Sequence, residues 1–511
     1  MGKKHFGIAP GDAGLAALSG LLLTASFPKV DWGFLAWIAL VPLFHATKGE
    51  APLAGFKLGC LTGLVHYATL LYWVIGVTST YGRLPMVLCW VILGLLVVYL
   101  SLYPAVFAMM ISGRRQTSPM AFRCAPFLWA GLEYLRAFLL SGFPWENLGC
   151  SQYNRLHLIQ ISDMLGMYGL SALIVAVNVA LFELFDSALQ KRRMAWKPTL
   201  AAAVVIAGFL GYGAWRIARV DRAAESAPKW KVSLVQGNID QSVKWMASFQ
   251  GETLRRYGTL SMEALENRPD LIIWPETALP FYFFHDEGLT AQVLALVRTC
   301  GVHFLVGSPS FRAEGSEIYY YNSAFLLAPS GDVLGKYDKV HLVPYGEYVP
   351  LKRFFPFLGK MVEAVGDFDS GKKGQVLSLN TQKLGVLICF EVIFPGLARA
   401  VAQNGAQLLV NITNDAWFGT SSAPYQHLSM AVFRAVENHR GLARAANTGI
   451  SAFIDPVGRL LDQTPLYEEA VRARAMPMMD EKTFYTCYGD LFAIGCVLIS
   501  LVFCVDFFRK R

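Results

Sequence analysis

Long apolar segments dominate this chain up to about residue 215, and they constrain its fold more than any other feature. A helix needs roughly 20 apolar residues to cross a hydrocarbon core of about 30 Å. We expect eight spans, at residues 13–27, 33–46, 58–77, 85–111, 124–140, 161–185, 199–215 and 491–508. Because 54% of the residues are hydrophobic and only 16% are charged, the chain is predicted to be a polytopic α-helical membrane protein.

Lys and Arg gather in alternate loops between these spans, which predicts the orientation, since basic loops stay in the cytoplasm. The basic side of the eight-span arrangement holds Lys3, Lys4, Lys48, Lys57, Arg114, Arg115, Arg123, Lys191, Arg192, Arg193, Lys197, Arg509, Lys510 and Arg511. The opposite loops hold scattered cations such as Lys29, Arg83 and Arg155. Both termini are therefore expected in the cytoplasm. The net charge of +8 comes largely from this asymmetry and gives no argument for nucleic acid as a partner.

A long polar region separates the seventh span from the eighth, and a charged linker is expected before it at residues 216–229. Strands are predicted at residues 231–236, 271–274, 303–307, 323–327, 383–388, 408–412 and 451–454, and helices at 250–266, 290–299, 396–403 and 429–440. This alternation predicts a layered α/β domain with its own core. The expected domains are a seven-span membrane domain (1–216), an extracytoplasmic α/β domain (217–488), and a last span with a cytoplasmic tail (489–511).

Three residues of this region can together carry acyl transfer through a thioester. Glu276 follows the run 271–275, Lys339 lies in the segment 336–344, and Cys389 ends the run 384–388. A thiol needs a base to take its proton, and the oxyanion that forms needs a fixed positive donor. Taken singly, each residue also fits a simpler interpretation: a solvated glutamate, a solvated Lys–Asp pair, or a buried inert cysteine.

Only three of the nine cysteines, Cys300, Cys389 and Cys487, belong to the polar region. An odd number leaves at least one free thiol unless it pairs between chains or with a cysteine of the membrane region. A thiol that stays free in an oxidising compartment indicates use or deep burial.

The local motifs, in their order along the chain, resemble those of the nitrilase, or carbon–nitrogen hydrolase, superfamily. They are Val235-Gln236-Gly237-Asn238, Lys244-Trp245, Trp274-Pro275-Glu276-Thr277-Ala278, Lys339-Val340-His341-Leu342-Val343-Pro344, Ile388-Cys389-Phe390-Glu391, Asn414-Asp415-Ala416-Trp417-Phe418-Gly419 and Asn447-Thr448-Gly449-Ile450, with Phe143-Pro144-Trp145 in the membrane region. Within that superfamily, eight spans with the polar domain before the last one resemble the apolipoprotein N-acyltransferase family. The resemblance implies a nitrilase-like αββα sandwich for the polar domain.

The resemblance also implies a role for each candidate residue. Glu276 would be the general base, Lys339 would stabilise the tetrahedral oxyanion, and Cys389 would become acylated. Glu347, Glu391 and Phe390 would support them, although some members carry Tyr where this chain has Phe390, so any role of that hydroxyl does not transfer. Trp245, Trp417 and Trp145 match positions expected to bind substrate, with a core or interface aromatic as the alternative. The charge of Lys339 should also favour the Cys389 thiolate.

The reaction implied is a two-step transfer at the outer face of a bacterial inner membrane. Cys389 attacks a phospholipid ester, and the α-amino group of a diacylglyceryl-cysteine on a lipoprotein then takes the acyl chain as an amide. The partners implied are these two lipid substrates and the bilayer, the protein acting as a monomer without cofactor. His341 and His427 are not expected to bind a metal, because the polar region lacks the tight ligand spacing of zinc sites.

Two other functions stay open. A membrane-tethered amidase of the nitrilase type would use the same three residues on a small amide, with water as the final acceptor. A transporter or scaffold should bury several ionisable residues in its spans. Few are expected there: Glu133 and Arg136, which can pair on one helix face, and Asp163 and Glu183 near predicted ends. Glu146 either binds a lipid headgroup or has a structural role.

Overall fold

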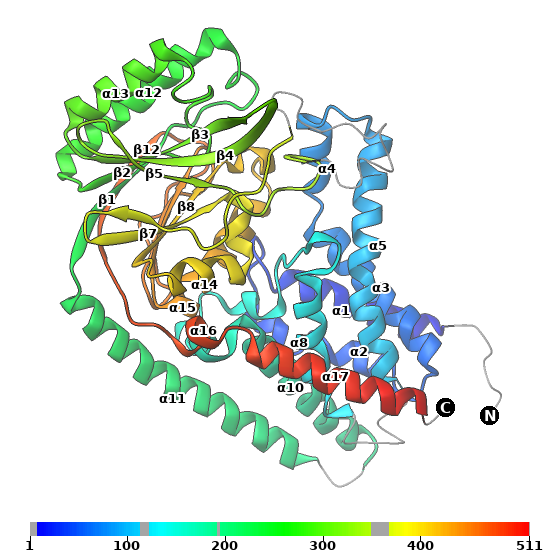
Figure 1. Ribbon diagram of the computed structural model, residues 1–511. Helices are drawn as coiled ribbons and strands as arrows, with labels where there is room; N and C mark the ends of the chain where they lie inside the picture. Colours follow the sequence, from blue (N-terminus) through cyan, green and yellow to red (C-terminus); the bar gives the residue numbers. More distant parts are fainter. Residues whose placement is uncertain (1–7, 113–121, 192–194, 349–366, 510–511) are drawn as a thin grey trace. The chain divides into compact units, whose positions relative to one another are not determined.

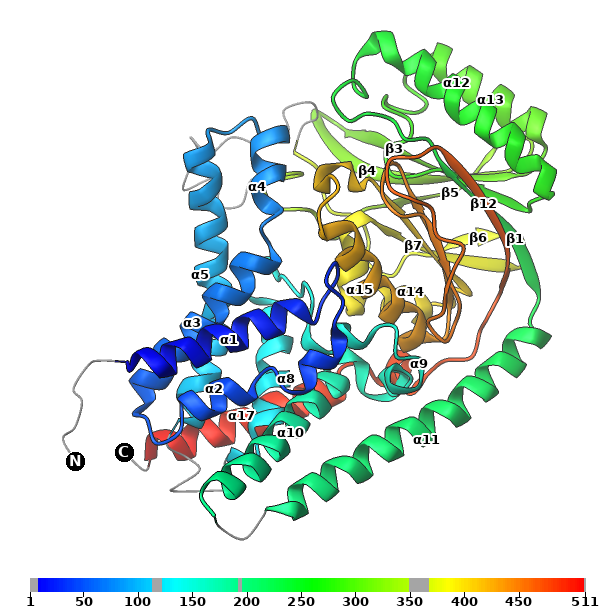
Figure 2. The ribbon, with the colours of Figure 1, turned by 180° about the vertical axis from the view of Figure 1, so that it is seen from behind.

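The computed structural model describes residues 8–112, 122–191, 195–348 and 367–509, and the chain divides into two compact units (Figures 1 and 2). The helical unit comprises Met1–Ile75, Pro85–Ile217 and Tyr488–Arg511, and the sandwich unit comprises Gly76–Leu84 and Ala218–Cys487. Eight of the basic residues used to predict orientation lie outside the described residues: Lys3, Lys4, Arg114, Arg115, Arg192, Arg193, Lys510 and Arg511.

Helices make up the regular structure of the helical unit. They are α1 (Pro10–Ala25), η1 (Gly33–Trp37), α2 (Val41–Ala46), α3 (Pro52–Leu70), α5 (Met86–Ile111), α8 (Ala125–Arg136), η3 (Leu139–Ser141), η4 (Leu148–Gln152), α9 (Leu156–Ile159), α10 (Ser162–Leu189), α11 (Trp196–Ser226) and α17 (Leu491–Arg509). A short α4 (Val74–Gly76) and a π-helical turn, η2 (Val77–Tyr81), follow α3 at the boundary between the units.

Three helices in the described residues, α5, α10 and α11, are long and apolar enough to cross a membrane. The pair Pro52–Leu70 and Val74–Tyr81, bent by 57°, adds a fourth if it is one span. The chain is therefore a membrane protein. Each predicted span contains helix, but the second one is divided into η1 and α2. The second residue of α2 is Pro42, which cannot donate a backbone N–H.

The segment 216–229, predicted as a linker, contains the boundary between the two units but is largely helical. Helix α11 continues through this charged segment to Ser226. Alanine, arginine and glutamate are strong helix formers, so polarity alone does not end a helix. The helix ends two residues before Pro228, where the backbone before a proline disfavours helical geometry.

Two six-stranded sheets form the centre of the sandwich unit. The first has the order β12-β1-β2-β3-β4-β5 and the second β11-β10-β9-β8-β7-β6. The strands are β1 (Lys229–Gln236), β2 (Leu271–Ile273), β3 (His303–Glu314), β4 (Glu317–Leu327), β5 (Val333–Asp338), β6 (Leu377–Leu379), β7 (Gln382–Ile388), β8 (Leu408–Thr413), β9 (Gly441–Ala446), β10 (Ala452–Ile454), β11 (Leu460–Leu461) and β12 (Ala470–Pro477). Strands β1, β2 and β3 run parallel, as do β7, β8 and β9.

Helices cover the outer faces of both sheets, which confirms the predicted αββα sandwich. Helices α12 (Ala247–Ala264) and α13 (Glu287–Cys300) lie side by side on the first sheet, and α14 (Pro395–Gln403) and α15 (Ala423–Asn438) lie on the second (Figure 1). The core under α12 includes Tyr257 stacked on Trp274 at a centroid distance of 4.9 Å. This packing anchors strand β2 immediately before the turn that carries Glu276.

All predicted strands and helices of this region coincide with observed elements, but five strands were not predicted: β5, β6, β9, β11 and β12. The sequence of β9, Gly-Leu-Ala-Arg-Ala-Ala, has the composition of a helix, and its conformation is set by pairing with β8 and β10. Tertiary contacts override local propensity there.

Candidate active site

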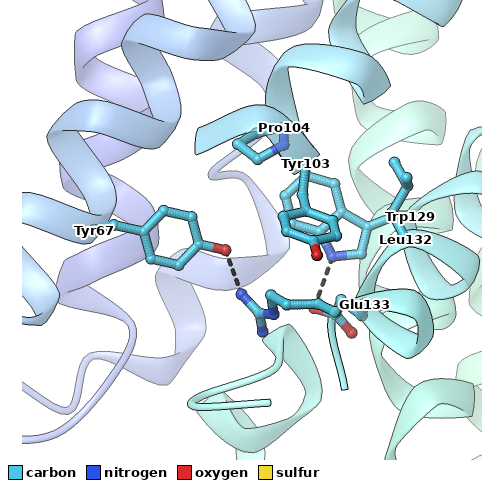
Figure 3. A pocket seen from close by; sticks show the side chains of 7 residues that line it. Tyr67, Tyr103, Pro104, Trp129, Leu132 and Glu133 are labelled. Atoms are coloured by element: carbon cyan, nitrogen blue, oxygen red, sulfur yellow. Dashed lines mark hydrogen bonds between the residues drawn. The ribbon is translucent and has the colours of Figure 1, made fainter. Parts of the chain in front are cut away.

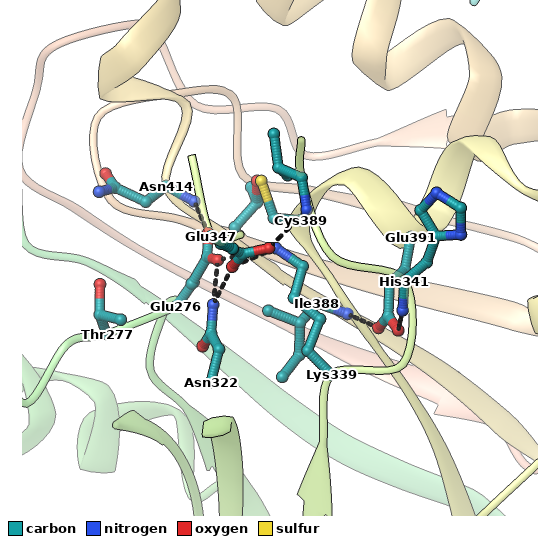
Figure 4. A network of polar contacts seen from close by, with 12 residues as sticks. Glu276, Thr277, Asn322, Lys339, His341, Glu347, Ile388, Cys389, Glu391 and Asn414 are labelled. Carbon is teal, nitrogen blue, oxygen red and sulfur yellow. Dashed lines mark hydrogen bonds and ion pairs between the residues drawn. The ribbon is translucent and has the colours of Figure 1, made fainter. Parts of the chain in front are cut away.

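The three proposed catalytic residues lie at the ends of three different strands. Glu276 is three residues beyond β2, Lys339 directly follows β5, and Cys389 directly follows β7 as the first residue of the short helix η6 (Cys389–Ile393). Figure 4 shows the three side chains converging, although the residues are far apart in the sequence. Loops on a rigid scaffold of this kind commonly carry catalytic groups.

One ammonium group contacts two carboxylates at this point. Lys339 Nζ lies 2.9 Å from Glu347 Oε1 and 3.5 Å from Glu276 Oε1. Asn322, on β4, donates from Nδ2 to the same two oxygens, at 2.9 and 2.8 Å respectively. The site therefore holds more carboxylates than ammonium groups, and Asn322, which the sequence did not single out, fixes the two carboxylates together.

Backbone amides hold the other oxygen of each carboxylate. Glu276 Oε2 accepts from the N–H of Asn414 at 2.9 Å, and Glu347 Oε2 accepts from the N–H of Val343 at 2.8 Å. Both residues are buried. The carboxylates are thus fixed before any substrate binds, as electrostatic preorganisation requires.

Burial and charge set the protonation of the lysine and the cysteine in opposite ways. Burial lowers the pKa of Lys339, but Glu347 and Glu276 outweigh it and raise that pKa well above its usual range. Burial raises the pKa of the Cys389 thiol, and Glu276 raises it further, while Lys339 lowers it by less. Lys339 acts in the expected direction without making the resting cysteine a thiolate, so a base must take the proton during attack.

Glu391 joins the segment that carries Lys339 to the turn that carries Cys389. Its carboxylate is fully buried and accepts from the N–H groups of Ile388 at 2.6 Å, Val340 at 2.6 Å and His341 at 3.1 Å. Burial raises its pKa to about 7, against the lowering by these backbone bonds. Cys389 itself has φ of +52°, a left-handed conformation that is rare outside glycine and common at functional sites. Glu391 therefore stabilises a strained turn at the nucleophile.

Comparison with known proteins covers both units. A model of the carbon–nitrogen hydrolases matches residues 231–481, and a model of the apolipoprotein N-acyltransferase N-terminal domain matches residues 19–180. Proteins named apolipoprotein N-acyltransferase include one from Geobacter metallireducens, 46% identical over 97% of this chain and 95% of its own length. Another, from Chlorobaculum tepidum, is 32% identical over 97% of each chain. This chain belongs to the apolipoprotein N-acyltransferase family. It is an acyltransferase whose carbon–nitrogen hydrolase domain contains all three candidate catalytic residues.

In this member of the apolipoprotein N-acyltransferase family, His427 contacts the backbone of the cysteine. Its Nε2 lies 3.2 Å from the Cys389 carbonyl oxygen and its Nδ1 lies 3.1 Å from Asp415 Oδ1. Arg444 donates to Asp415 Oδ2 at 2.7 Å, and all three side chains are fully or almost fully buried. The ring of His341 lies 3.8 Å from that of Phe394. Both histidines thus have structural contacts, and no group of three potential metal ligands occurs among the described residues.

The aromatic candidates divide between the units. Trp417 is partly buried, and its ring lies 4.8 Å from that of Tyr81, whose hydroxyl donates to the Ala416 carbonyl at 2.8 Å. Trp245 is also partly buried, and its indole N–H has no hydrogen-bond partner among the described residues. Trp145 belongs to the helical unit, where it is 1% exposed and lies 5.0 Å from the ring of Trp73. Only Trp245 and Trp417 therefore share a unit with the catalytic candidates.

Phe390 packs within the sandwich unit and is almost fully buried, and its ring lies 5.3 Å from the ring of Phe394.

In the helical unit, Glu133 and Arg136 line a small cavity, and each forms hydrogen bonds with other residues (Figure 3). Glu133 accepts from Trp129 at 2.9 Å and from the N–H of Leu148 at 2.7 Å. Arg136 donates to the hydroxyl of Tyr67. The expected pair is not formed.

Proposed function

We propose that this enzyme moves an acyl chain from a membrane phospholipid to the α-amino group of the N-terminal diacylglyceryl-cysteine of a lipoprotein, through a thioester on Cys389. The observation that carries this proposal is the sequence identity of 46%, along almost the whole chain, with a relative named apolipoprotein N-acyltransferase. The buried cluster of Glu276, Lys339 and Cys389 supports it, because these groups suffice for thioester chemistry.

In the first step, Glu276 takes the thiol proton as the sulfur of Cys389 attacks the ester carbonyl. The oxyanion that forms is stabilised by the Lys339 ammonium, and the backbone N–H of Phe390 is suitably placed in sequence to add a second donor. When the intermediate collapses, the C–O bond breaks and the leaving alkoxide receives the proton from Glu276. The products are a lysophospholipid and an acyl thioester.

In the second step, the lipoprotein amine attacks the thioester carbonyl and Glu276 takes a proton from the attacking nitrogen. The C–S bond then breaks, and the sulfur receives that proton, so Cys389 returns as a thiol and the acyl chain becomes an amide. Glu276 acts as base and acid in both steps. Glu347 and Glu391 hold the lysine and the cysteine turn in place.

The remaining expectations complete the proposal. The protein crosses a bacterial inner membrane eight times, with both termini in the cytoplasm and the domain 217–488 in the periplasm. Trp245 and Trp417 bind lipid substrate in the sandwich domain, and Trp145 does so from the membrane domain. The enzyme acts as a monomer without cofactor, because the cluster supplies a base, a cation and a nucleophile by itself.

The test uses the full-length protein in phospholipid nanodiscs with an isotopically labelled acyl chain and a synthetic diacylglyceryl-cysteinyl peptide. We expect labelled N-acyl peptide and one lysophospholipid for each peptide modified, detected by mass spectrometry. Ammonia release from small amides without consumption of phospholipid would overturn the proposal in favour of an amidase. Wild-type yields in a Cys389→Ala variant would overturn the thioester route.

A further inference from the structure

A second buried lysine, Lys244, contacts the turn that carries Glu276 and has no part in the two chemical steps. It belongs to the segment between β1 and α12, and its side chain is 0% exposed. Lysine is rarely buried without a specific partner, because removing an ammonium group from water is unfavourable. Its contacts therefore indicate what it does.

The Lys244 side chain makes two hydrogen bonds with the turn that carries the general base. Nζ lies 2.8 Å from Thr277 Oγ1 and 3.3 Å from the backbone carbonyl oxygen of Glu276. Thr277 has φ of +46°, and a β-branched residue in the left-handed region is strained. The lysine thus holds two groups of a turn that would otherwise relax and redirect Glu276.

The same segment supports the other side of the Glu276 carboxylate. Gln241 Oε1 accepts from Asn414 Nδ2 at 2.6 Å, and the N–H of Asn414 donates to Glu276 Oε2 at 2.9 Å. Figure 4 shows Thr277 and Lys339 on opposite sides of Glu276. The carboxylate is therefore aligned from the Lys339 side by ion pairing, while Lys244 fixes the backbone on which it stands.

The ionisation of Lys244 fits this position. Burial lowers its pKa to about 7, although the Glu276 carboxylate opposes that shift. A neutral amine has two N–H donors, and Thr277 Oγ1 and the Glu276 carbonyl oxygen are two matching acceptors. A charged Lys244 would also disfavour the proton that Glu276 must accept, whereas the neutral amine would not.

Other ionisable groups surround the Glu276 carboxylate from different elements. Lys339 follows β5, Glu347 lies beyond it, and Cys389 begins η6. Asp240, on the same segment as Lys244, accepts from the backbone and side chain of Ser242. The effect of Lys244 on the pH dependence of acylation must therefore be measured as a difference between the wild-type protein and the Lys244 variants.

We infer that Lys244 is a positioning residue for the general base, holding the strained Glu276–Thr277 turn through hydrogen bonds to Thr277 Oγ1 and the Glu276 carbonyl oxygen. This inference rests on the proposed role of Glu276. It predicts that a side chain of similar size can replace Lys244 only if it donates a hydrogen bond.

The experiment measures single-turnover acylation of Cys389 by labelled phospholipid between pH 5.5 and 9 in the full-length protein. Lys244→Met removes the donors at similar size, and we expect acylation to slow by about 10²-fold, as for a displaced catalytic group. Lys244→Gln keeps an N–H donor and should restore most of that loss. The acylation rate of the wild-type protein should rise with pH through about 7, the pKa of Lys244. Because neither variant has an amine at this position, the rise in both should be smaller.

Two controls separate the possible failures. Lys482→Met removes an exposed lysine that also donates to a backbone carbonyl, that of Gln403 at 2.7 Å, and should acylate like wild type. Glu276→Gln should abolish acylation; wild-type acylation in that variant would refute the proposed function itself.

The inference is wrong if Glu276 is essential but Lys244→Met acylates normally. It is also wrong if folded Lys244→Gln is as slow as Lys244→Met. Should Lys244→Met fail to fold, an unchanged pH profile in Lys244→Gln would overturn it.

Discussion

Three buried acids of the helical unit and the catalytic cluster of the sandwich unit contact basic groups in different ways. In the helical unit, each of the three acids contacts one basic residue: Asp163 contacts Arg216 at 2.6 Å, Asp186 contacts Lys48 at 2.5 Å, and Glu183 contacts Arg123 at 3.2 Å. In the sandwich unit, Lys339 faces two carboxylates, and a thiol lies beside them. The first arrangement brings one carboxylate to one basic group, while the second brings two carboxylates to one ammonium group.

This difference separates structural from catalytic charge. A neutral buried pair contributes to a defined fold, and breaking it leaves an uncompensated charge. Two carboxylates around one ammonium group are instead an arrangement of like charges typical of catalytic sites. Asp163, Asp186 and Glu183 thus do not by themselves indicate a transport pathway, because each of these three acids has a basic partner.

The largest effect is expected from removing the shared cation. Lys339→Met should slow acylation of Cys389 by about 10³-fold, since the oxyanion loses its charged donor. Two carboxylates would then lie together without an ammonium, so we also expect a lower midpoint of thermal unfolding. Single-turnover acylation and calorimetry measure the two effects. A folded variant that acylates within tenfold of wild type would contradict the catalytic side of the comparison.

The next effect concerns Glu391, which joins the segment that carries Lys339 to the turn that carries Cys389. Glu391→Gln should slow acylation by about 10²-fold, because an amide cannot accept all the backbone N–H bonds that shape the Cys389 turn. Glu437→Gln is a matched control, since Glu437 is also fully buried but pairs with Arg434. It should reduce stability without slowing acylation by the folded protein. Equal rates in the two variants would show that Glu391 has no special role.

The resting state of the nucleophile gives a smaller and graded effect. Because burial and Glu276 raise the pKa of Cys389, its alkylation by iodoacetamide should increase by about tenfold per pH unit from pH 7 to 9 without a plateau. Peptide mass spectrometry can follow Cys389 separately from the exposed Cys487. A plateau below pH 8 would mean that Lys339 prevails over Glu276 and holds a thiolate.

The smallest effect on catalysis is expected in the helical unit. Asp163→Asn removes the carboxylate charge that pairs with the buried Arg216 and should reduce the free energy of unfolding by about 3–5 kcal/mol. The acylation rate of the remaining folded protein should not change. Adding Arg216→Met should recover much of the stability, because the uncompensated charge is removed. A lost acylation rate in the folded single variant would place this pair in the catalytic machinery.

The sequence predicted the parts of the site that depend on local pattern. Glu276 and Cys389 each end a buried apolar run, so their place at a strand end could be inferred from nearby residues alone. Asn322 could not be found in this way. It lies within β4, and its contact with both carboxylates depends on the register of β4 between β3 and β5. A polar residue in a buried strand was the one available signal.

Two errors have the same physical origin. The segment before β1 was interpreted as a linker because it is charged, and β9 was not predicted because it is rich in alanine. Charge in the first segment indicates solvent exposure, and alanine in the second indicates helix propensity. Neither indicates the neighbouring elements that decide the conformation. Lys244 belongs to a motif visible in the sequence, yet its contacts with Glu276 and Thr277 join residues more than 30 positions apart.

The most direct test of the central claim is detection of an acyl group on Cys389. The full-length protein is incubated with phospholipid carrying one labelled acyl chain, without a lipoprotein acceptor, and then digested for peptide mass spectrometry. We predict one hydroxylamine-sensitive acyl group on Cys389, released as an N-acyl amide when a diacylglyceryl-cysteinyl peptide is added. Formation of that amide with Cys389 unmodified throughout, or equal acyl loading of a Cys389→Ala variant, would contradict the account.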